Sequence, residues 1–240
     1  MRRIVILALF GLLWLETGFA QSPKVYLPME QMPDLVQCLP APPDTASVAF
    51  AVDVQRYQWG KEMRRDSLRA AQARRDAIWI LDTLAAVFSE PFGMKICPEK
   101  TPEIYTAFMR GVATIQQVRV QPKAYYHRIR PFEYFDDHLL DPGEEKELRG
   151  EGSYPSGHTI RGWAAALILS EINPAAANDL FARAWVYGEN RVIVGAHWQS
   201  DVDASRPAAS IGCSALHSCP EFRRQMDRAR REFKRLQAKK

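Results

Sequence analysis

The residues of this 240-residue chain that could do chemistry gather in three short segments of its second half. In the first segment, Lys123 and Arg130 stand seven residues apart, and Pro131 follows the arginine. An ammonium group and a planar guanidinium group can together neutralise a dianion. If the segment is helical, the spacing places both cations on one face. Taken alone, the pattern is more typical of a solvated basic face.

The second segment places Ser156, Gly157 and His158 directly before a stretch with helical apolar periodicity. Unpaired backbone N–H groups and the positive end of the helix dipole meet at such a helix start. These residues could therefore hold an anion and hand it a proton, and glycine would let the backbone approach closely. A capped helix start with an incidental histidine explains the segment alone equally well.

In the third segment, Arg191 precedes His197, and Asp201 follows that histidine by four residues. On a helix, this spacing puts the carboxylate one turn from the imidazole, where it can accept the Nδ1 proton and leave Nε2 as a nucleophile. For one such His–Asp spacing taken alone, the default interpretation is a pair on the protein surface. The three segments complement one another, however. The first supplies cations, the second supplies amide donors and an acid, and the third supplies a nucleophile that a carboxylate orients. Agreement of so many fixed residue types excludes coincidence, so the three segments together indicate one chemical site.

The motifs K-x6-R-P, P-S-G-H and S-R-x5-H-x3-D resemble the signature of the type 2 phosphatidic acid phosphatase (PAP2) and vanadium haloperoxidase superfamily. In the third motif, Asn190 stands where the family usually has serine. Residues 152–163 and 191–203 are also similar to the secreted bacterial class A acid phosphatases. The resemblance covers most of the chain, and it implies an all-α, single-domain helical bundle of the PAP2 and haloperoxidase type.

By this resemblance, His197 is the nucleophile that forms a phosphohistidine, and Asp201 orients it. His158 protonates the leaving oxygen and later activates water. Phosphate oxygens would be held by Lys123, Arg130, Ser156, Gly157 and Arg191. The resemblance implies no metal and no other cofactor.

The activity implied is that of a periplasmic acid phosphatase that hydrolyses nucleotides, sugar phosphates and aryl phosphates. Its partner would be a small-molecule phosphomonoester rather than a nucleic acid. An apyrase-like hydrolase of nucleoside di- and triphosphates is the alternative, because it would use the same catalytic residues. A membrane lipid phosphatase is disfavoured because spanning helices are missing, and a haloperoxidase is disfavoured by the chain length.

Helices must position these segments, because period-two alternation is nearly absent. Apolar residues recur at three- and four-residue steps within residues 47–86 and after Thr101-Pro102. Further helices are expected over residues 157–171, 174–194 and 196–216, separated by Asn173-Pro174 and by Gly195. With 47% hydrophobic and 25% charged residues, the chain has material for one large core. We expect seven or eight helices.

The C-terminal residues 222–236 have a basic amphipathic pattern. One interpretation is a module that binds nucleic acid or a membrane surface. However, the apolar stripe of this segment needs burial. It consists of Phe222, Met226, Phe233 and Leu236. A helix docked on the bundle, or on a second subunit in a homodimer, explains them more simply.

The N-terminal residues 1–20 have the pattern of a secretory signal peptide, with Arg2-Arg3, an apolar run from Ile4 to Leu15 and Ala20 before the expected cut. Export to the periplasm follows from this pattern. Residues 21–46 would form a proline-rich arm and residues 47–240 the phosphatase domain. No later stretch approaches the roughly 18 apolar residues of a membrane helix, so we expect no span in the mature form.

Four cysteines remain after the signal peptide: Cys38, Cys97, Cys213 and Cys219. An even number in an exported chain suggests up to two disulfides, with three pairings open and Cys213–Cys219 the local one. A metal site is less favoured, because there is no C-x-x-C pair and only His217 lies near two cysteines.

The side chains around the first motif include several aromatic rings. These rings could wall a leaving-group pocket, although core packing is the expected use of most of them. They are Tyr125, Tyr126, Phe132, Tyr134 and Phe135. His127 and His138, like His217, receive no role.

Overall fold

The structure, a computed structural model, describes residues 23–239, and within that range every regular element is helical. Eight helices have eleven or more residues: α2 (Val48–Met63), α3 (Ser67–Ala77), α4 (Leu81–Phe92), α5 (Pro102–Ile115), α9 (Gly157–Ile172), α10 (Ala177–Val194), α11 (Gln199–Leu216) and α12 (Pro220–Gln237). Shorter ones are α1 (Leu35–Cys38), α6 (Val120–Tyr126), α7 (Pro131–Tyr134) and α8 (Glu145–Leu148). The predicted all-α class is confirmed for the described residues.

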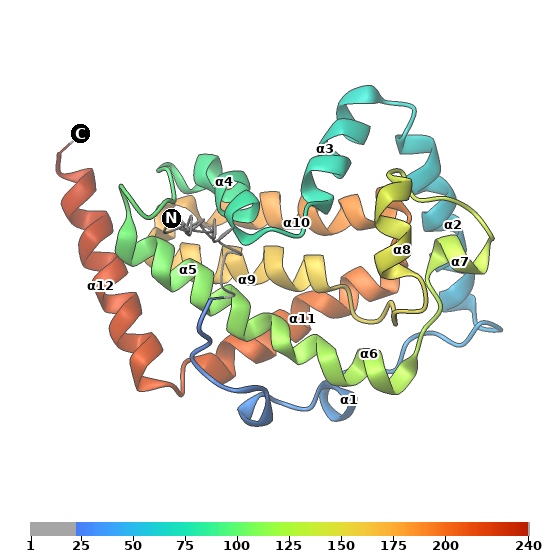
Figure 1. Cartoon of the computed structure of the whole chain (residues 1–240), viewed down its shortest axis with the longest axis horizontal. Helices are drawn as coiled ribbons and strands as arrows, with labels where there is room; N and C mark the ends of the chain where they lie inside the picture. Colours follow the sequence, from blue (N-terminus) through green and yellow to red (C-terminus); the bar gives the residue numbers. More distant parts are fainter. Residues whose placement is uncertain (1–22, 240) are drawn as a thin grey trace, which may run out of the picture.

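Helix α9 is the central element of the bundle, with α5, α10 and α11 packed around it (Figure 1). Its small residues, including Ala164 and Ala165, are fully buried, so neighbouring helices can approach closely. Larger side chains such as Ile168 and Leu169 fill the space between them. Because nearly every side of α9 is buried, its first turn is held firmly at one end of the bundle.

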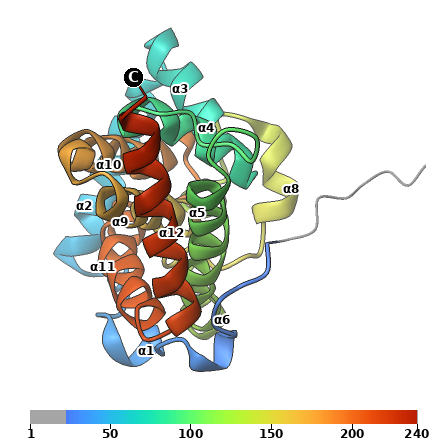
Figure 2. The same cartoon turned by 90° about the vertical axis from the view of Figure 1, so that its left-hand side faces the viewer.

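Helix α12 closes the opposite end of the bundle and lies along α5 (Figure 2). Its apolar side chains Phe222, Met226 and Phe233 are buried, whereas Leu236 is only half-buried. The carboxylate of Glu232 accepts hydrogen bonds from the first backbone N–H groups of α5, at 3.0 and 2.9 Å. The structure therefore favours the docked helix over the binding module, and it places the docking surface on this chain's own bundle.

The proline-rich segment is an ordered arm that runs along the bundle (Figure 1). The backbone N–H of Tyr26 donates to the Thr114 hydroxyl at 2.9 Å, and the Tyr154 hydroxyl donates to the Pro40 carbonyl at 2.6 Å. The predicted signal peptide lies outside the described residues. None of the helices within residues 23–239 is long and apolar enough to cross a membrane.

Two details of the predicted helices are wrong. The apolar periodicity within residues 47–86 predicts a helix that includes Ile78, but α3 ends at Ala77, and Ile78 lies 43% exposed in the link to α4. The helix expected from Ala196 starts only at Gln199, because Gly195 turns the chain with a φ of 86° and ends α10. His197 therefore lies in a bend rather than on a helix.

The disulfide expectation is not met, because all four cysteines are free thiols in the structure. Cys213 faces Glu171 and His217, whereas the Cys219 thiol contacts the Tyr26 carbonyl at 3.8 Å. The two sulfur atoms of the expected local pair thus have different neighbours. Cys38 is exposed and Cys97 is buried.

Candidate active site

A cavity of about 610 Å³ opens beside the first turn of α9. His158, His197, Lys123 and Arg130 all line it, so the structure brings side chains from all three motifs to one place. The link between α3 and α4, which packs against the first turn of α9, also lines the cavity, and so do acidic residues of the segment around α8. The cavity is larger than a phosphate group and has room for part of an organic substituent.

His197 sits in the bend between α10 and α11, where two carboxylate contacts set its orientation. Its Nδ1 lies 3.3 Å from Oδ2 of Asp201, and the same oxygen accepts the backbone N–H of Trp198 at 2.9 Å. Because a carboxylate accepts protons, Nδ1 carries the ring proton and Nε2 keeps its lone pair. The Nη1 atom of Arg130 lies 3.2 Å from that Nε2. The lone pair therefore points toward a cation.

Asp201 is itself held by a buried arginine that the sequence analysis did not single out. Arg128 donates to Asp201 at 2.6 Å and to Asp53 at 2.7 Å, and all three side chains are less than a tenth exposed. Asp53, on α2, also accepts the backbone N–H of Ser200 at 2.8 Å. This network fixes the carboxylate that orients His197, because both of the aspartates share one guanidinium.

The side chains of Lys123 and Arg130 come together at one loop carbonyl, and they do not lie on one helix. Helix α6 ends before His127, whose φ is 44°, and Arg130 precedes α7, so the expected shared helical face is wrong. Both side chains nevertheless donate to the carbonyl of Gly152, Arg130 at 3.4 Å. A Cβ at Gly152 would lie 2.5 Å from the Lys123 carbonyl oxygen, so only glycine allows this approach.

The first turn of α9 forms a second wall of the cavity, as predicted from the P-S-G-H motif. The Ser156 hydroxyl caps the helix by accepting the Thr159 N–H at 3.3 Å. His158 donates from Nε2 to the Ala77 carbonyl at 2.8 Å, which leaves Nδ1 for a substrate. A Cβ at Gly157 would lie 2.9 Å from Cδ of Arg119, so a larger residue here would displace the Arg119 side chain.

Arg191 is completely buried and only partly satisfied. Its Nη2 contacts Glu144 at 3.5 Å, whereas Nε and Nη1 have no hydrogen-bond partner among residues 23–239. The neighbouring Asn190 donates to Asp76 at 2.8 Å, and Arg183 pairs with the same carboxylate at 2.6 Å. Asn190 thus anchors the end of α10 through Asp76. The unpaired Nε and Nη1 of Arg191 are buried, and Arg191 is not among the residues that line the cavity.

Burial and positive charge shape the ionisation of both histidines. Burial and the cations Arg130 and Lys123 hold the pKa of His197 well below its usual range. Burial, followed by the charge of Arg191, does the same for the pKa of His158. The pKa of Lys123 is lowered too, by burial and by Arg130. Burial is the larger cause of each shift and crowded positive charge the smaller one, and a bound dianion would relieve the crowding of charge.

Comparisons with known proteins bear directly on this geometry. The PAP2 superfamily matches residues 104–224, which include every predicted catalytic and phosphate-binding residue. The non-specific acid phosphatase of Providencia stuartii is 40% identical over 212 residues, 88% of this chain and 85% of the relative. That of Salmonella typhimurium is 39% identical over 197 residues, 81% of this chain and 78% of the relative. The acid phosphatase of Zymomonas mobilis is 34% identical over 195 residues, 81% and 74% of the two chains.

The chain belongs to the PAP2 superfamily. It stands among the class A acid phosphatases of that superfamily, as the sequence resemblance indicated.

The aromatic side chain that lines the acid phosphatase site is not one of the five that the sequence suggested. Trp79 lines the cavity, with its ring 4.6 Å from that of His158. Of the five aromatic residues around the first motif, none lines the cavity. Phe132 is fully buried, and Tyr134 and Phe135 pack on Trp198. Core packing is therefore the use of Phe132 and Phe135, whereas Tyr134 remains 46% exposed.

Arg119 is a further cation that sequence reasoning missed. It lines the cavity beside Gly157, and its guanidinium lies 5.3 Å from the Trp79 ring centroid. Of the histidines left without a role, His127 reaches the cavity wall, whereas His138 pairs with Glu145 at 3.1 Å. No motif spacing singles out Arg119, because only the tertiary packing places it beside α9.

Proposed function

We propose that the chain hydrolyses phosphomonoesters of broad range through a phosphohistidine on His197, without a metal ion, in the periplasm. The observation that carries this proposal is the orientation of His197. Its Nδ1 faces Asp201 and its Nε2 faces Arg130 in a cavity rich in cations. A neutral, buried imidazole with an aimed lone pair is a nucleophile poised for phosphorus.

In the first step, Nε2 of His197 attacks phosphorus and the bond to the leaving oxygen breaks. His158 gives that oxygen a proton, and the alcohol departs. In the second step, His158 takes a proton from water while the water oxygen attacks phosphorus. The P–N bond then breaks, and its electron pair returns to Nε2. Microscopic reversibility requires this double role of one acid–base group.

Charge on the non-bridging oxygens is balanced by protein groups. Lys123 and Arg130 supply two cations, and Arg191 has guanidinium N–H groups to donate. The N–H groups at the start of α9, next to Ser156 and Gly157, add the positive end of a helix dipole. Electrostatic stabilisation of a phosphoryl group needs donors arranged in this way before the reaction starts.

Hydrolysis of p-nitrophenyl phosphate near pH 6 tests metal independence. We expect the rate to be unchanged in excess EDTA, because the residues above supply the stabilising charge. Vanadate should inhibit competitively, since its trigonal-bipyramidal form resembles the transition state. Loss of activity in EDTA that added metal restores, or indifference to millimolar vanadate, would contradict the mechanism.

The pH dependence should have its optimum on the acid side. His197 must be neutral, and its lowered pKa keeps it neutral at pH values well below those at which a histidine usually titrates. His158 must carry a proton in the first step, but its pKa is lowered as well. That proton therefore has to arrive with the substrate, whose second phosphate pKa is about 6. We expect kcat/KM to fall about tenfold per pH unit above that value. Constant kcat/KM through pH 8 would refute this assignment.

The substrate range is proposed from the cavity walls. Ile78 and Trp79 offer an apolar surface to an organic leaving group, and apolar contact discriminates only weakly between alcohols. An apyrase-like preference is the second candidate, and Arg119 favours it as an extra cation for a further phosphate. Turnover of ATP beside that of a nucleoside monophosphate separates the two. Export to the periplasm is proposed from the signal-peptide pattern of residues 1–20.

A further inference from the structure

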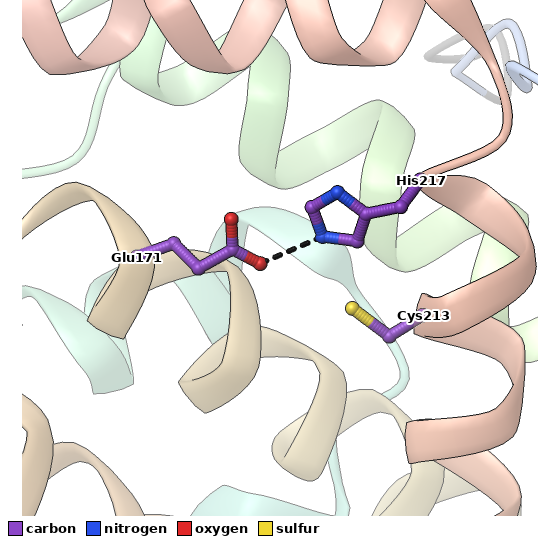
Figure 3. A group of neighbouring side chains, drawn as sticks. All are labelled: Glu171, Cys213 and His217. Carbon is purple, nitrogen blue, oxygen red and sulfur yellow. Dashed lines mark hydrogen bonds and ion pairs between the residues drawn. The ribbon is translucent and has the colours of Figure 1, made fainter.

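A second cluster of chemically active side chains lies at the far end of α9. Glu171 comes from the last turn of α9, Cys213 from α11, and His217 follows α11 directly (Figure 3). One oxygen, one sulfur and one ring nitrogen of these residues all lie within 4.8 Å of one another. The sequence shows only the spacing of Cys213 and His217, and the fold adds the carboxylate from a distant segment.

The three donor atoms match the preferences of zinc. Zinc combines thiolate, imidazole and carboxylate ligands, and tetrahedral bonds of 2.0–2.3 Å place such ligand atoms roughly 3.5 Å apart. Glu171 and His217 now share a hydrogen bond of 2.8 Å, so zinc binding requires His217 to lose its Nε2 proton and the two atoms to separate by about 0.7 Å. The sulfur of Cys213, within 4.8 Å of both atoms, has to approach them by about 1 Å at most. A thiolate and a carboxylate would together neutralise the two charges of the ion.

Neighbouring groups fix the two outer ligands. Arg230, on α12, pairs with Oε2 of Glu171 at 2.8 Å, while Oε1 faces His217. The ring of His217 packs edge-on against Phe222, with centroids 5.2 Å apart. Such surrounding contacts orient metal ligands in known sites. The side chains of Glu171 and His217 are 30% and 39% exposed, so water can reach a fourth coordination position.

We propose that Glu171, Cys213 and His217 bind one zinc ion that ties the ends of α9 and α11 together. His158 and Glu171 are separated by 13 residues of one helix, or about 20 Å. The ion therefore takes no part in phosphate chemistry. It stabilises the end of the bundle where α12 docks, because the folded chain binds it and the unfolded chain has no such site.

Calorimetric titration with zinc after removal of bound metal tests this site. The wild-type protein should bind one zinc ion per chain, and its Tm should rise by about 5 °C when zinc reaches 100 times Kd. Cys213→Ser and His217→Gln should each weaken this binding at least tenfold. Cys219→Ser and His138→Gln serve as matched controls, and they should bind zinc as the wild type does. With cobalt, a thiolate charge-transfer band should appear in the wild type and be absent in Cys213→Ser.

The result that would overturn the site is zinc binding of equal strength in the wild type, Cys213→Ser and His217→Gln. Absence of binding to the wild type at micromolar zinc would overturn it as well. The cobalt spectrum and the two separate variants keep the test valid if one variant folds poorly. The assay is independent of phosphatase activity, so failure here would leave the proposed hydrolysis untouched, and the reverse also holds.

Discussion

The His197→Ala variant is expected to lose phosphatase activity by on the order of 10⁴-fold or more in kcat. Among the residues of 23–239 that line the cavity, His197 alone has a lone pair that is backed by a carboxylate and directed at a cation. Without it, no side chain at that position can form the P–N bond. The measurement is single-turnover hydrolysis of p-nitrophenyl phosphate by the purified variant.

A matched control separates loss of chemistry from loss of folding. His138 pairs with a carboxylate like His197, but it is exposed and lies outside the cavity. His138→Ala should therefore keep nearly full activity. The Tm of both variants should be measured alongside. Retention of a tenth or more of kcat by His197→Ala would refute its assignment as nucleophile.

The His158→Ala variant should show an effect that depends on the leaving group. Hydrolysis of an alkyl phosphate should fall by about 10²- to 10⁴-fold, because its alkoxide must be protonated as it departs. p-Nitrophenolate departs without a proton, so its release should be affected far less. The second step still needs a base to activate water. We therefore expect a rapid stoichiometric burst of p-nitrophenolate followed by slow turnover.

The burst is read by stopped-flow absorbance under enzyme excess and then under substrate excess. Trp79→Phe is a useful companion, because it alters the ring next to His158 while keeping the imidazole. That variant should keep the wild-type ratio of rates for the two leaving groups. An equal loss for alkyl and nitrophenyl phosphates in His158→Ala, without a burst, would contradict the acid–base role.

Much of the site could be predicted because its residues lie in motifs with fixed spacing. Ser156 at the start of α9 and Asp201 four residues after His197 act over one turn of chain, so their contacts depend on local geometry. The helical class followed from apolar periodicity in the same way. Some helix boundaries were not predicted correctly. Gly195, whose φ is positive, ends α10, and His197 therefore lies outside the helix predicted for it.

Other features of the structure depend on contacts between segments that are distant in the sequence. The local spacing of residues does not reveal them. Arg128 pairs with Asp53 across 75 residues, although both look like ordinary surface charges in the sequence. Trp79 lines the cavity because α3 ends at Ala77, which apolar periodicity did not indicate. Glu171 joins Cys213 and His217 only through the packing of α9 on α11.

The most direct test of the central claim is isolation of the phosphoenzyme. His158→Ala should be mixed with ³²P-labelled p-nitrophenyl phosphate, quenched within the burst and digested for peptide mapping. We predict a label that is stable in base, labile in acid and attached to the peptide containing His197. A label on another residue, or none while p-nitrophenolate is released in a burst, would contradict the phosphohistidine mechanism.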